Sequence, residues 1–476
     1  MPAPLDPSLV ARFVAIVGER NAFTEGGDVA PFVEEQRGQL NGVSELVLRP
    51  ASTEEVSAIL GIAQEAGTPI VPQGGNTGLQ GAGVPRGSAH DGRGEVVVSL
   101  GRMNRVLDVD PAGNTMLVEA GCVLQRAQEA ADEHDRLFPL SLGAQGSAMI
   151  GGNIGTNAGG TGVLAYGNTR DLVMGLEVVL PGGEVWNGLS RLRKDNTGYD
   201  LKNLFVGAEG TLGIVTKAVL KLFPKPKGRE VAFVAVRDPD AALRLFERTR
   251  AAAFSQATAF ELLSPRAMRW TLAFTETRPL MPDHEDWFVL VEISSGRSPE
   301  DARDLLEGIL AGAFGAGEAS DAVLAESGRQ FDLFWKLRED LSWAQRGHGA
   351  SIKHDISVPV AAIPNFIEEA DRAVESVCPR GRIVNFGHMG DGNLHYNVSR
   401  PADWRDDDFL ALYEAMNDAV YAVVLAHGGS ISAEHGIGQA KRDRLPHVKG
   451  PVAMSMMHAI KRALDPDGIM NPGKVL

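Results

Sequence analysis

The sequence predicts an α+β protein with at least two domains and a C-terminal helical segment. A chain of 476 residues is too long for one small core, so we expect two or three domains. The pattern changes at 221–228, a stretch rich in Pro and Lys. Short β-rich runs between glycine turns precede it, and longer strands alternating with Ala-rich helices follow it. Beyond Pro401 the apolar residues recur at helical spacing.

These patterns give the expected boundaries of the domains and elements. We expect an N-terminal helical segment at 1–45, a first domain at 46–224, a second domain at 225–400 and a C-terminal helical segment at 401–476. Apolar spacing predicts helices at 8–17, 50–66, 241–252, 300–310, 331–345, 408–427 and 452–464. Runs of β-forming residues predict strands at 70–72, 96–98, 115–118, 176–180, 231–236, 288–293 and 352–358.

Composition and charge narrow the classes of protein. A hydrophobic fraction of 44% with 22% charged residues is typical of globular proteins and argues against disorder. The net charge of -15, without a run of five Lys or Arg, argues against a nucleic-acid partner. Two cysteines, no apolar signal-like stretch in 1–21 and no apolar run long enough to span a bilayer lead us to expect a cytoplasmic protein.

The first domain contains three glycine-rich loops, at 71–83, 151–160 and 209–214. In the first, five glycines within ten positions follow a predicted strand, so successive N–H groups can point into one concavity and hold a phosphate. No Gly-Lys-Ser/Thr closes this loop, which excludes a Walker motif. One such loop could be a surface turn, but three within one domain favour a long diphosphate ligand.

The same loops carry a resemblance to the FAD-binding family that includes vanillyl-alcohol oxidase and p-cresol methylhydroxylase. The resemblance covers 46–223 and rests on 72–85, 151–160 and 209–216. It implies a two-subdomain FAD-binding domain, followed by an α/β substrate (cap) domain with an antiparallel sheet. Some family members attach the flavin through His or Cys in the first loop, but this chain has Gln73-Gly74-Gly75-Asn76 there, which implies non-covalent FAD.

The resemblance also implies a set of FAD-binding positions. They are Pro72, Gly74, Gly75, Asn76, Thr77, Gly78, Leu79, Gly143, Ser147, Gly151, Gly152, Asn153, Thr156, Asn157, Gly159, Gly160, Gly167, Glu209, Gly210, Gly213, Ile214 and Asn471.

Two histidines flank a predicted hairpin turn in 386–397. Asp391-Gly392 is a preferred pair for a two-residue turn. Pairing outward from this turn sets His388 opposite His395, so the imidazoles share one face, about 5 Å apart at Cβ. Asn397, two residues along the strand, shares that face.

Two histidines make half of a metal site, and Glu434, which precedes His435, is the candidate third ligand. A single histidine is more often a core residue, but the paired set favours a metal. Two imidazoles and a carboxylate suit zinc, manganese or iron(II) and leave coordination positions open. A metal there would polarise a bound hydroxyl, so that a base such as His435 removes the proton.

Cationic residues for an acidic substrate also occur in the second half. Arg338 and Ser342 share a predicted helix face at i, i+4, where an anion could use both. In the strand that follows, Ile352 and Ile356 alternate with Lys353, so the lysine faces away from the apolar side. The alternative interpretation of Lys353 is a solvated surface residue.

From about Trp335 through Lys474, the chain resembles the D-2-hydroxyglutarate dehydrogenase branch of the same flavoprotein family. The resemblance implies His388, His395 and Glu434 as metal ligands, His435 as base and substrate contact, Asn397 as a substrate contact, and Arg338, Ser342 and Lys353 as a carboxylate clamp. A second cation suits a dicarboxylate. We therefore expect D-2-hydroxyglutarate as the substrate, with D-malate as the next candidate.

Two alternatives and several partners complete the predictions. A D-lactate or glycolate dehydrogenase would leave Lys353 solvated, and a non-catalytic flavin electron-transfer subunit would not need the histidines and Glu434. The expected electron acceptor is another flavoprotein, such as an electron-transfer flavoprotein, or a quinone. The family resemblance alone implies a homodimer.

Overall fold

The computed structural model describes residues 5–86, 92–281 and 286–476, and the chain divides into two compact units. Unit 1 comprises the described residues of Met1–Gly159, Gly167–Lys225 and Glu434–Leu476, and unit 2 comprises those of Gly160–Tyr166 and Pro226–Ala433. One division falls after Lys225, inside the stretch rich in Pro and Lys. Of the N-terminal stretch considered for a signal peptide, residues 1–4 lie outside the described part.

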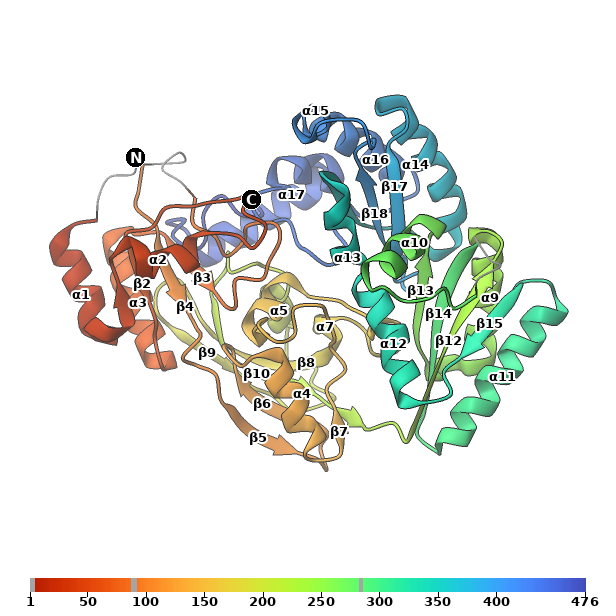
Figure 1. Cartoon of the computed structure of the whole chain (residues 1–476). Coiled ribbons are helices and arrows are strands. Elements are labelled where there is room, and N and C mark those ends of the chain that lie inside the picture. Colours follow the sequence, from red (N-terminus) through yellow and green to blue (C-terminus); the bar gives the residue numbers. More distant parts are fainter. Residues whose placement is uncertain (1–4, 87–91, 282–285) are drawn as a thin grey trace. The chain divides into compact units, whose positions relative to one another are not determined.

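Unit 1 is built around two sheets. One sheet has the order β1-β2-β4-β3, with β2, β4 and β3 parallel, and the other is antiparallel with the order β5-β6-β10-β8-β9. The C-terminal segment belongs to the first of them. Met470 forms a parallel bridge with Ile70 of β3, and Figure 1 shows the last residues (blue) among the N-terminal elements (red). The expected two-subdomain organisation of this domain is confirmed.

The strands of unit 1 are β1 Ala22–Phe23, β2 Leu46–Leu48, β3 Ile70–Gln73, β4 Val96–Ser99, β5 Val106–Asp110, β6 Thr115–Glu119, β7 Arg136–Leu137, β8 Val173–Val179, β9 Val185–Gly188, β10 Ile214–Lys221 and β11 Phe223–Pro224. Its α-helices are α1 Pro7–Val17, α2 Gly26–Val33, α3 Thr53–Ala66, α4 Leu124–Asp132, α5 Ile150–Thr156, α7 Thr169–Leu172, α8 Lys202–Phe205 and α17 Leu445–Leu464.

Local sequence signals explain where several of these helices begin and end. The Ser52 side chain accepts a hydrogen bond from the Glu55 N–H and so caps α3, which lies within the predicted helix 50–66. The second glycine-rich stretch differs from the prediction, because residues 150–156 form α5 instead of a loop. Asn157, with φ 51°, ends this helix in the left-handed conformation.

Unit 2 contains one antiparallel sheet of seven strands in the order β15-β12-β14-β13-β17-β18-β16. Val231 and Phe233 of β12 face a core that also contains residues of α10, α12 and α13. Helices α9 and α11 also pack against the sheet (Figure 1). The antiparallel sheet expected for the second domain is confirmed.

The strands of unit 2 are β12 Gly228–Val236, β13 Ala257–Leu263, β14 Trp287–Ser295, β15 Asp321–Leu324, β16 Ser351–Ser357, β17 Arg382–Gly387 and β18 Asn393–Ser399. Its α-helices are α6 Val163–Tyr166, α9 Pro239–Ala253, α10 Pro265–Phe274, α11 Pro299–Gly315, α12 Gly328–Glu339, α13 Leu341–Ala344, α14 Ile363–Val377, α15 Asp406–Leu410 and α16 Tyr413–Ala426.

Three boundaries differ from the expected ones. The predicted C-terminal segment 401–476 is divided, because α15 and α16 belong to unit 2 and only the residues from Glu434 onward belong to unit 1. The predicted helix 331–345 is α12 followed by α13, with Asp340 (ψ -8°) between them. Similarly, 408–427 divides into α15 and α16, because Leu412 (ψ 2°) departs from helical backbone.

Among the helices of the described ranges, none combines the length and apolar character that crossing a bilayer requires.

Replacing Phe334 tests the hydrophobic core that packs against the unit 2 sheet. Phe334 is 1% exposed, and its ring meets the Phe233 ring edge-on at 5.3 Å. We expect Phe334→Ala to lower the free energy of unfolding by about 3–5 kcal/mol, because it leaves a cavity. Phe254→Ala is the control, since Phe254 is 85% exposed, and should change it by less than about 0.5 kcal/mol. If Phe334→Ala and the wild type had the same midpoint of urea denaturation, this assignment of the core would be wrong.

Candidate active site

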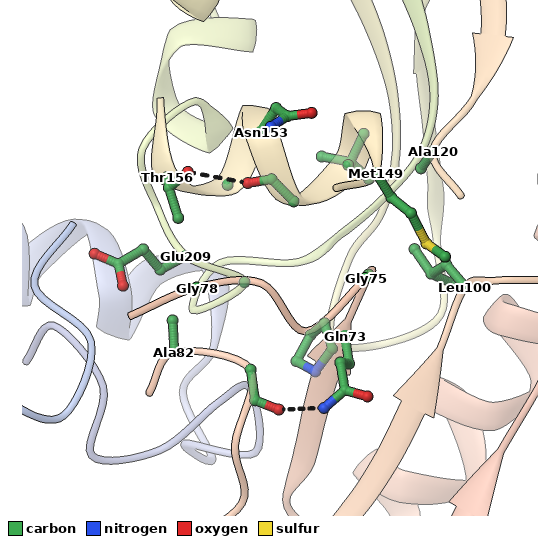
Figure 2. A pocket seen from close by; sticks show the side chains of 18 of the residues that line it. Gln73, Gly75, Gly78, Ala82, Leu100, Ala120, Met149, Asn153, Thr156 and Glu209 are labelled. Carbon is green, nitrogen blue, oxygen red and sulfur yellow. Dashed lines mark hydrogen bonds between the residues drawn. The ribbon is translucent and has the colours of Figure 1, made fainter. Parts of the chain in front are cut away.

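A pocket lies within unit 1 where strands of both sheets approach one another. Pro72 and Gln73 of β3 form part of its wall, as do Ile214 and Val215 of β10. Its volume is about 1000 Å³, including the part open to solvent. Figure 2 shows the glycine loops and α5 around it.

All three predicted glycine-rich stretches contribute to this pocket. The predicted FAD-binding positions among its lining residues are Pro72, Gly74, Gly75, Asn76, Thr77, Gly78, Gly151, Gly152, Asn153, Thr156, Glu209, Gly210, Gly213 and Ile214. The predicted positions outside the lining are Leu79, Gly143, Ser147, Asn157, Gly159, Gly160, Gly167 and Asn471. The convergence fits the hypothesis of one long diphosphate ligand.

Gly75 brings two of these segments together. A Cβ on Gly75 would lie 2.0 Å from the carbonyl oxygen of Ser147, a distance at which backbone must move. A Cβ on Gly210, whose φ is 72°, would lie 3.0 Å from the ring of Pro72. Side chains at these two positions would separate the loops that line the pocket.

Glu209 and Asn471 fix the loops at one end of the pocket. The Glu209 carboxylate accepts hydrogen bonds from the N–H groups of Ile437 and Gly438, at 2.7 and 2.8 Å. Burial raises the pKa of Glu209 to about 7, against the effect of those two hydrogen bonds. The Asn471 amide donates to the carbonyl oxygens of Ala82 and Glu209, at 2.9 and 2.7 Å. Asn471 therefore holds the pocket loops, although it does not line the pocket.

The sequence interpretation missed other lining residues, most of them small or apolar. They are Gln73, Ala82, Gly83, Leu100, Ala120, Ala148, Met149, Gly155, Phe205, Ala208 and Val215. Apolar lining positions carry no chemical signature in a single sequence. Ala120, Met149 and Ala208 nevertheless flank predicted elements or motifs, and this proximity is the signal that could have found them.

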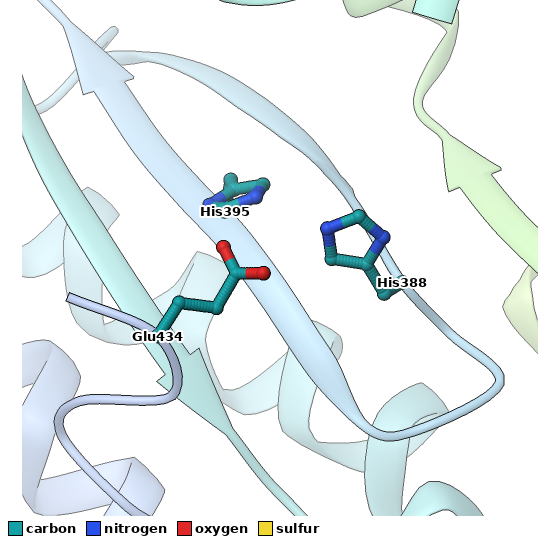
Figure 3. Close-up of side chains that lie close together, drawn as sticks. All are labelled: His388, His395 and Glu434. Atoms are coloured by element: carbon teal, nitrogen blue, oxygen red, sulfur yellow. The ribbon is translucent and has the colours of Figure 1, made fainter. Parts of the chain in front are cut away.

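The histidine hairpin of unit 2 has a different register from the predicted one. His395 of β18 pairs with Phe386 of β17, not with His388, so the predicted pairing is wrong by two residues. The cause is the connection, since residues 388–392 form a loop in which the Gly392 N–H donates to the His388 carbonyl. A shift of two residues keeps the same face of the sheet. The two imidazoles therefore still approach, with ring centroids 5.7 Å apart (Figure 3).

His388 and Arg338 share a buried carboxylate that sequence reasoning missed. Glu261 of β13 is 1% exposed; its Oε1 lies 2.8 Å from His388 Nδ1, and its Oε2 accepts from Arg338 Nε at 2.7 Å. Burial acts to raise the pKa of Glu261, but the positive charges of His388 and Arg338 lower it to about 2. A single Glu inside the buried run 257–263 was the available signal.

The face of the sheet that carries His395 also carries the predicted Lys353 and Asn397, together with Asp355. Lys353 of β16 pairs with Asn397 of β18, and Asp355 pairs with His395. Paired residues of antiparallel strands lie on the same face, so these four side chains form a square on that face. The prediction that Lys353 points away from Ile352 and the apolar side is confirmed.

The other members of the predicted carboxylate clamp differ in exposure. Arg338 is 6% exposed and stacks over the Phe386 ring at 5.2 Å, whereas Ser342 is exposed on α13. The Asn397 amide is buried and donates to Gln345 Oε1 at 3.0 Å. Gln345 is thus a further residue that sequence reasoning missed. The substrate-binding role of this set stays a prediction.

The third predicted metal ligand lies where the chain passes from unit 2 to unit 1. Glu434 is the first residue of its segment in unit 1 and is bonded to Ala433, the last residue of unit 2. Ser430, four residues earlier, forms an antiparallel bridge with Ser357 of β16. Glu434 and His435 therefore follow directly on a strand-like contact with the sheet that carries the histidines. Figure 3 draws the three candidate ligands.

The pocket and the sheet define the class of the protein. A glycine-lined pocket between two subdomains, with a separate antiparallel sheet domain that carries the histidines, is the arrangement of an FAD-dependent oxidoreductase with its own substrate domain. Two family models agree with this class. The FAD binding domain matches residues 44–188, and the C-terminal domain of FAD linked oxidases matches residues 225–475.

Full-length relatives define the branch. The chain is 38% identical to "D-2-hydroxyglutarate dehydrogenase, mitochondrial" of Arabidopsis thaliana, over 99% of this chain and 82% of the relative. It is 38% identical to the protein of the same name from Rattus norvegicus, over 92% and 79% of the two chains. It is 34% identical to the D-2-hydroxyglutarate dehydrogenase of Stutzerimonas stutzeri, over 99% of both. The chain belongs to the FAD-linked oxidase family, in the branch that contains these dehydrogenases.

Solved structures agree on the fold. A structure of p-cresol methylhydroxylase with substrate bound is 19% identical and superposes with a TM-score of 0.77 over 100% of this chain and 98% of that chain. An alkyldihydroxyacetonephosphate synthase is 18% identical, with a TM-score of 0.75 over 99% and 86%. The fold is that of the predicted flavoprotein family.

The space around Gly75 gives a direct test of the FAD pocket. We expect Gly75→Ala to weaken FAD binding by about 10- to 100-fold, because overpacking of this kind costs about 1–3 kcal/mol. The measurement is FAD titration of the deflavinated protein, followed by flavin fluorescence. Gly61→Ala is the control, because a Cβ there meets nothing within 4 Å. Unchanged FAD affinity in the Gly75 variant would place the cofactor elsewhere.

Proposed function

We propose that the protein is an FAD- and metal-dependent dehydrogenase that oxidises D-2-hydroxyglutarate to 2-oxoglutarate. The observation that carries this proposal is the square of side chains in which Lys353 pairs with Asn397 and Asp355 pairs with His395. It combines a cation and an amide with an imidazole on one face of the sheet. The relatives at 34–38% identity, each named a D-2-hydroxyglutarate dehydrogenase, support the same substrate.

The chain's own residues bind the substrate and move one proton. Arg338, Lys353 and Asn397 would hold the two carboxylates, since a dicarboxylate needs two separated cationic or amide groups. His435 would accept the proton of the C2 hydroxyl. The C2 hydrogen leaves with its two electrons as hydride, so the C–H bond breaks and the C=O double bond forms. The product is a 2-oxo acid.

FAD supplies the hydride acceptor when bound, and a divalent metal supplies a Lewis acid for the substrate hydroxyl. The residues fit FAD, because Gly75 and Gly210 bring together the loops that form the pocket for a long ligand. The donors also fit a metal. His388 donates Nδ1–H to Glu261, which leaves Nε2 as the ligand atom, and His395 lies beside it.

Zinc is the metal that we propose, with manganese or iron(II) as the alternatives, and Glu434 is the proposed third ligand. The residue types support this assignment, because two imidazoles and one carboxylate form catalytic zinc sites with open positions. The short link from the Ser430–Ser357 bridge also supports it, since four residues reach at most about 14 Å.

Three other activities are weighed against the proposal. D-Malate differs from D-2-hydroxyglutarate in length only, so the same clamp could accept it. A D-lactate or glycolate dehydrogenase would not use Lys353, and the named relatives do not favour it. A non-catalytic electron-transfer subunit would have no use for the adjacent imidazoles of His388 and His395.

The electron acceptor, the assembly and the location are further proposals. We propose that an electron-transfer flavoprotein or a quinone oxidises the reduced flavin, that the protein is a homodimer, and that it acts in the cytoplasm. The family resemblance supports the homodimer. The chain has only two cysteines, both buried, which suits the proposed cytoplasmic location.

Flavin reduction by substrate tests the proposed reaction. We expect anaerobic addition of D-2-hydroxyglutarate to bleach the flavin absorbance of the purified protein, and chelation followed by added zinc to abolish and then restore the bleaching. D-Malate, D-lactate and glycolate form the comparison set. Bleaching by the monocarboxylates alone would reassign the substrate. No bleaching by any of the four would overturn the proposal.

Replacing Lys353 tests the dicarboxylate clamp. We expect Lys353→Ala to raise KM for D-2-hydroxyglutarate by about 10- to 100-fold, because a charge-assisted hydrogen bond contributes about 1.5–3 kcal/mol. KM for D-lactate should change by less than about 3-fold, since that substrate has no second carboxylate for the charge-assisted bond. Lys336→Ala is the control, because Lys336 is an exposed lysine of the same unit that pairs with Asp340. Equal effects on both substrates would assign Lys353 to the solvated surface.

A further inference from the structure

Glu261 is a buried carboxylate that joins two predicted functional groups. Carrying the β13–β17 pairing beyond Leu263–Phe386 and Leu262–Gly387 by one step sets Glu261 opposite His388. Glu261 therefore shares the sheet face of Phe386. Each oxygen has one partner, since Oε1 contacts His388 Nδ1 at 2.8 Å and Oε2 accepts from Arg338 Nε at 2.7 Å.

We infer that Glu261 is a positioning residue that holds the metal ligand His388 and the substrate-binding Arg338 in one fixed arrangement. This inference rests on the proposed function. A carboxylate that accepts the Nδ1–H of an imidazole fixes its tautomer and ring orientation, which presents Nε2 to a metal. The same carboxylate accepts from Nε, which fixes the orientation of the guanidinium plane and leaves Nη2 as a further donor.

The Arg338 guanidinium retains donor capacity for a ligand. Its side chain is 7% exposed, and within the described ranges its Nη2 has no hydrogen-bond partner. Phe386 supports the guanidinium plane, with Cζ 5.2 Å from the ring centroid. Arg338 is a buried cation whose Nε donates to Glu261, so its Nη2 remains as a donor. That donor can bind a carboxylate of a ligand.

Glu261→Gln is the primary test, measured on the purified full-length holoenzyme. The amide is close in size to the carboxylate, but it carries no charge and cannot accept from both His388 and Arg338. We expect the zinc dissociation constant, measured by chelator competition, to rise by about 10- to 100-fold, as for other residues that orient metal ligands. KM for D-2-hydroxyglutarate at saturating zinc should also rise, while kcat changes less.

Glu292→Gln is the matched control. Glu292 lies on the neighbouring strand β14, is 3% exposed, and pairs with Arg229 and Trp335 at 2.8 and 2.9 Å. It therefore has the same burial and a comparable set of partners without contacting a predicted site residue. Zinc affinity and KM should stay at the wild-type values in this variant. Equal changes in the two variants would overturn the inference, because they would show a general effect of a lost buried ion pair.

A second variant covers the case in which Glu261→Gln does not fold. Glu261→Gln combined with Arg338→Met removes both charges of the pair, so no uncompensated cation stays buried. We expect this protein to fold, to lose affinity for D-2-hydroxyglutarate and still to bind zinc more weakly than the wild type. Wild-type zinc affinity would overturn the proposed role towards His388. If the proposed function itself is wrong, the wild-type protein will not reduce its flavin with substrate. That result distinguishes failure of the proposed function from failure of the inference about Glu261.

Discussion

The alternation of side chains across the antiparallel sheet of unit 2 is the constraint on which the proposed chemistry depends. Successive residues of each strand point to opposite faces, so the pairings of four adjacent strands decide which groups meet. Glu261 and Phe386 share a face, as do His395, Asn397 and Lys353. Val231 and Phe233 show that the same alternation fills a hydrophobic core elsewhere in the sheet. The sheet thus orders the polar groups of these strands, and the 388–392 loop adds His388 beside them.

Unit 1 places its functional groups by close backbone approach instead. Gly75 against Ser147 and Gly210 against Pro72 bring the chain closer than side chains would allow. Asn471 then connects two of the loops through their carbonyl oxygens. The pocket is lined largely by backbone and small residues, which suits a ligand recognised along its length. The two units thus use different physical means, side-chain alternation and glycine contact, to place their functional groups.

The sequence predicted features that depend on local chemistry. It identified the glycine stretches, the helix at 50–66 and the face of Lys353, because turn residues, apolar spacing and alternation act over a few positions. It did not predict the register of the histidine hairpin, because residues 388–392 form a longer loop in place of the two-residue turn that Asp391-Gly392 favours. It also missed Glu261, because a partner 127 residues away in the chain leaves no local signal.

The discontinuous unit 1 has a consequence for the order of folding during synthesis. The main segment of unit 2 is continuous from Pro226 to Ala433, so most of it can collapse as soon as it has been made. The flavin pocket needs Asn471 between Ala82 and Glu209, and Met470 beside Ile70. The earlier segments of unit 1 therefore cannot complete the pocket until the last residues have been synthesised. Premature termination a few codons before the end would therefore spare the sheet of unit 2 and leave an apoprotein with an unclosed pocket.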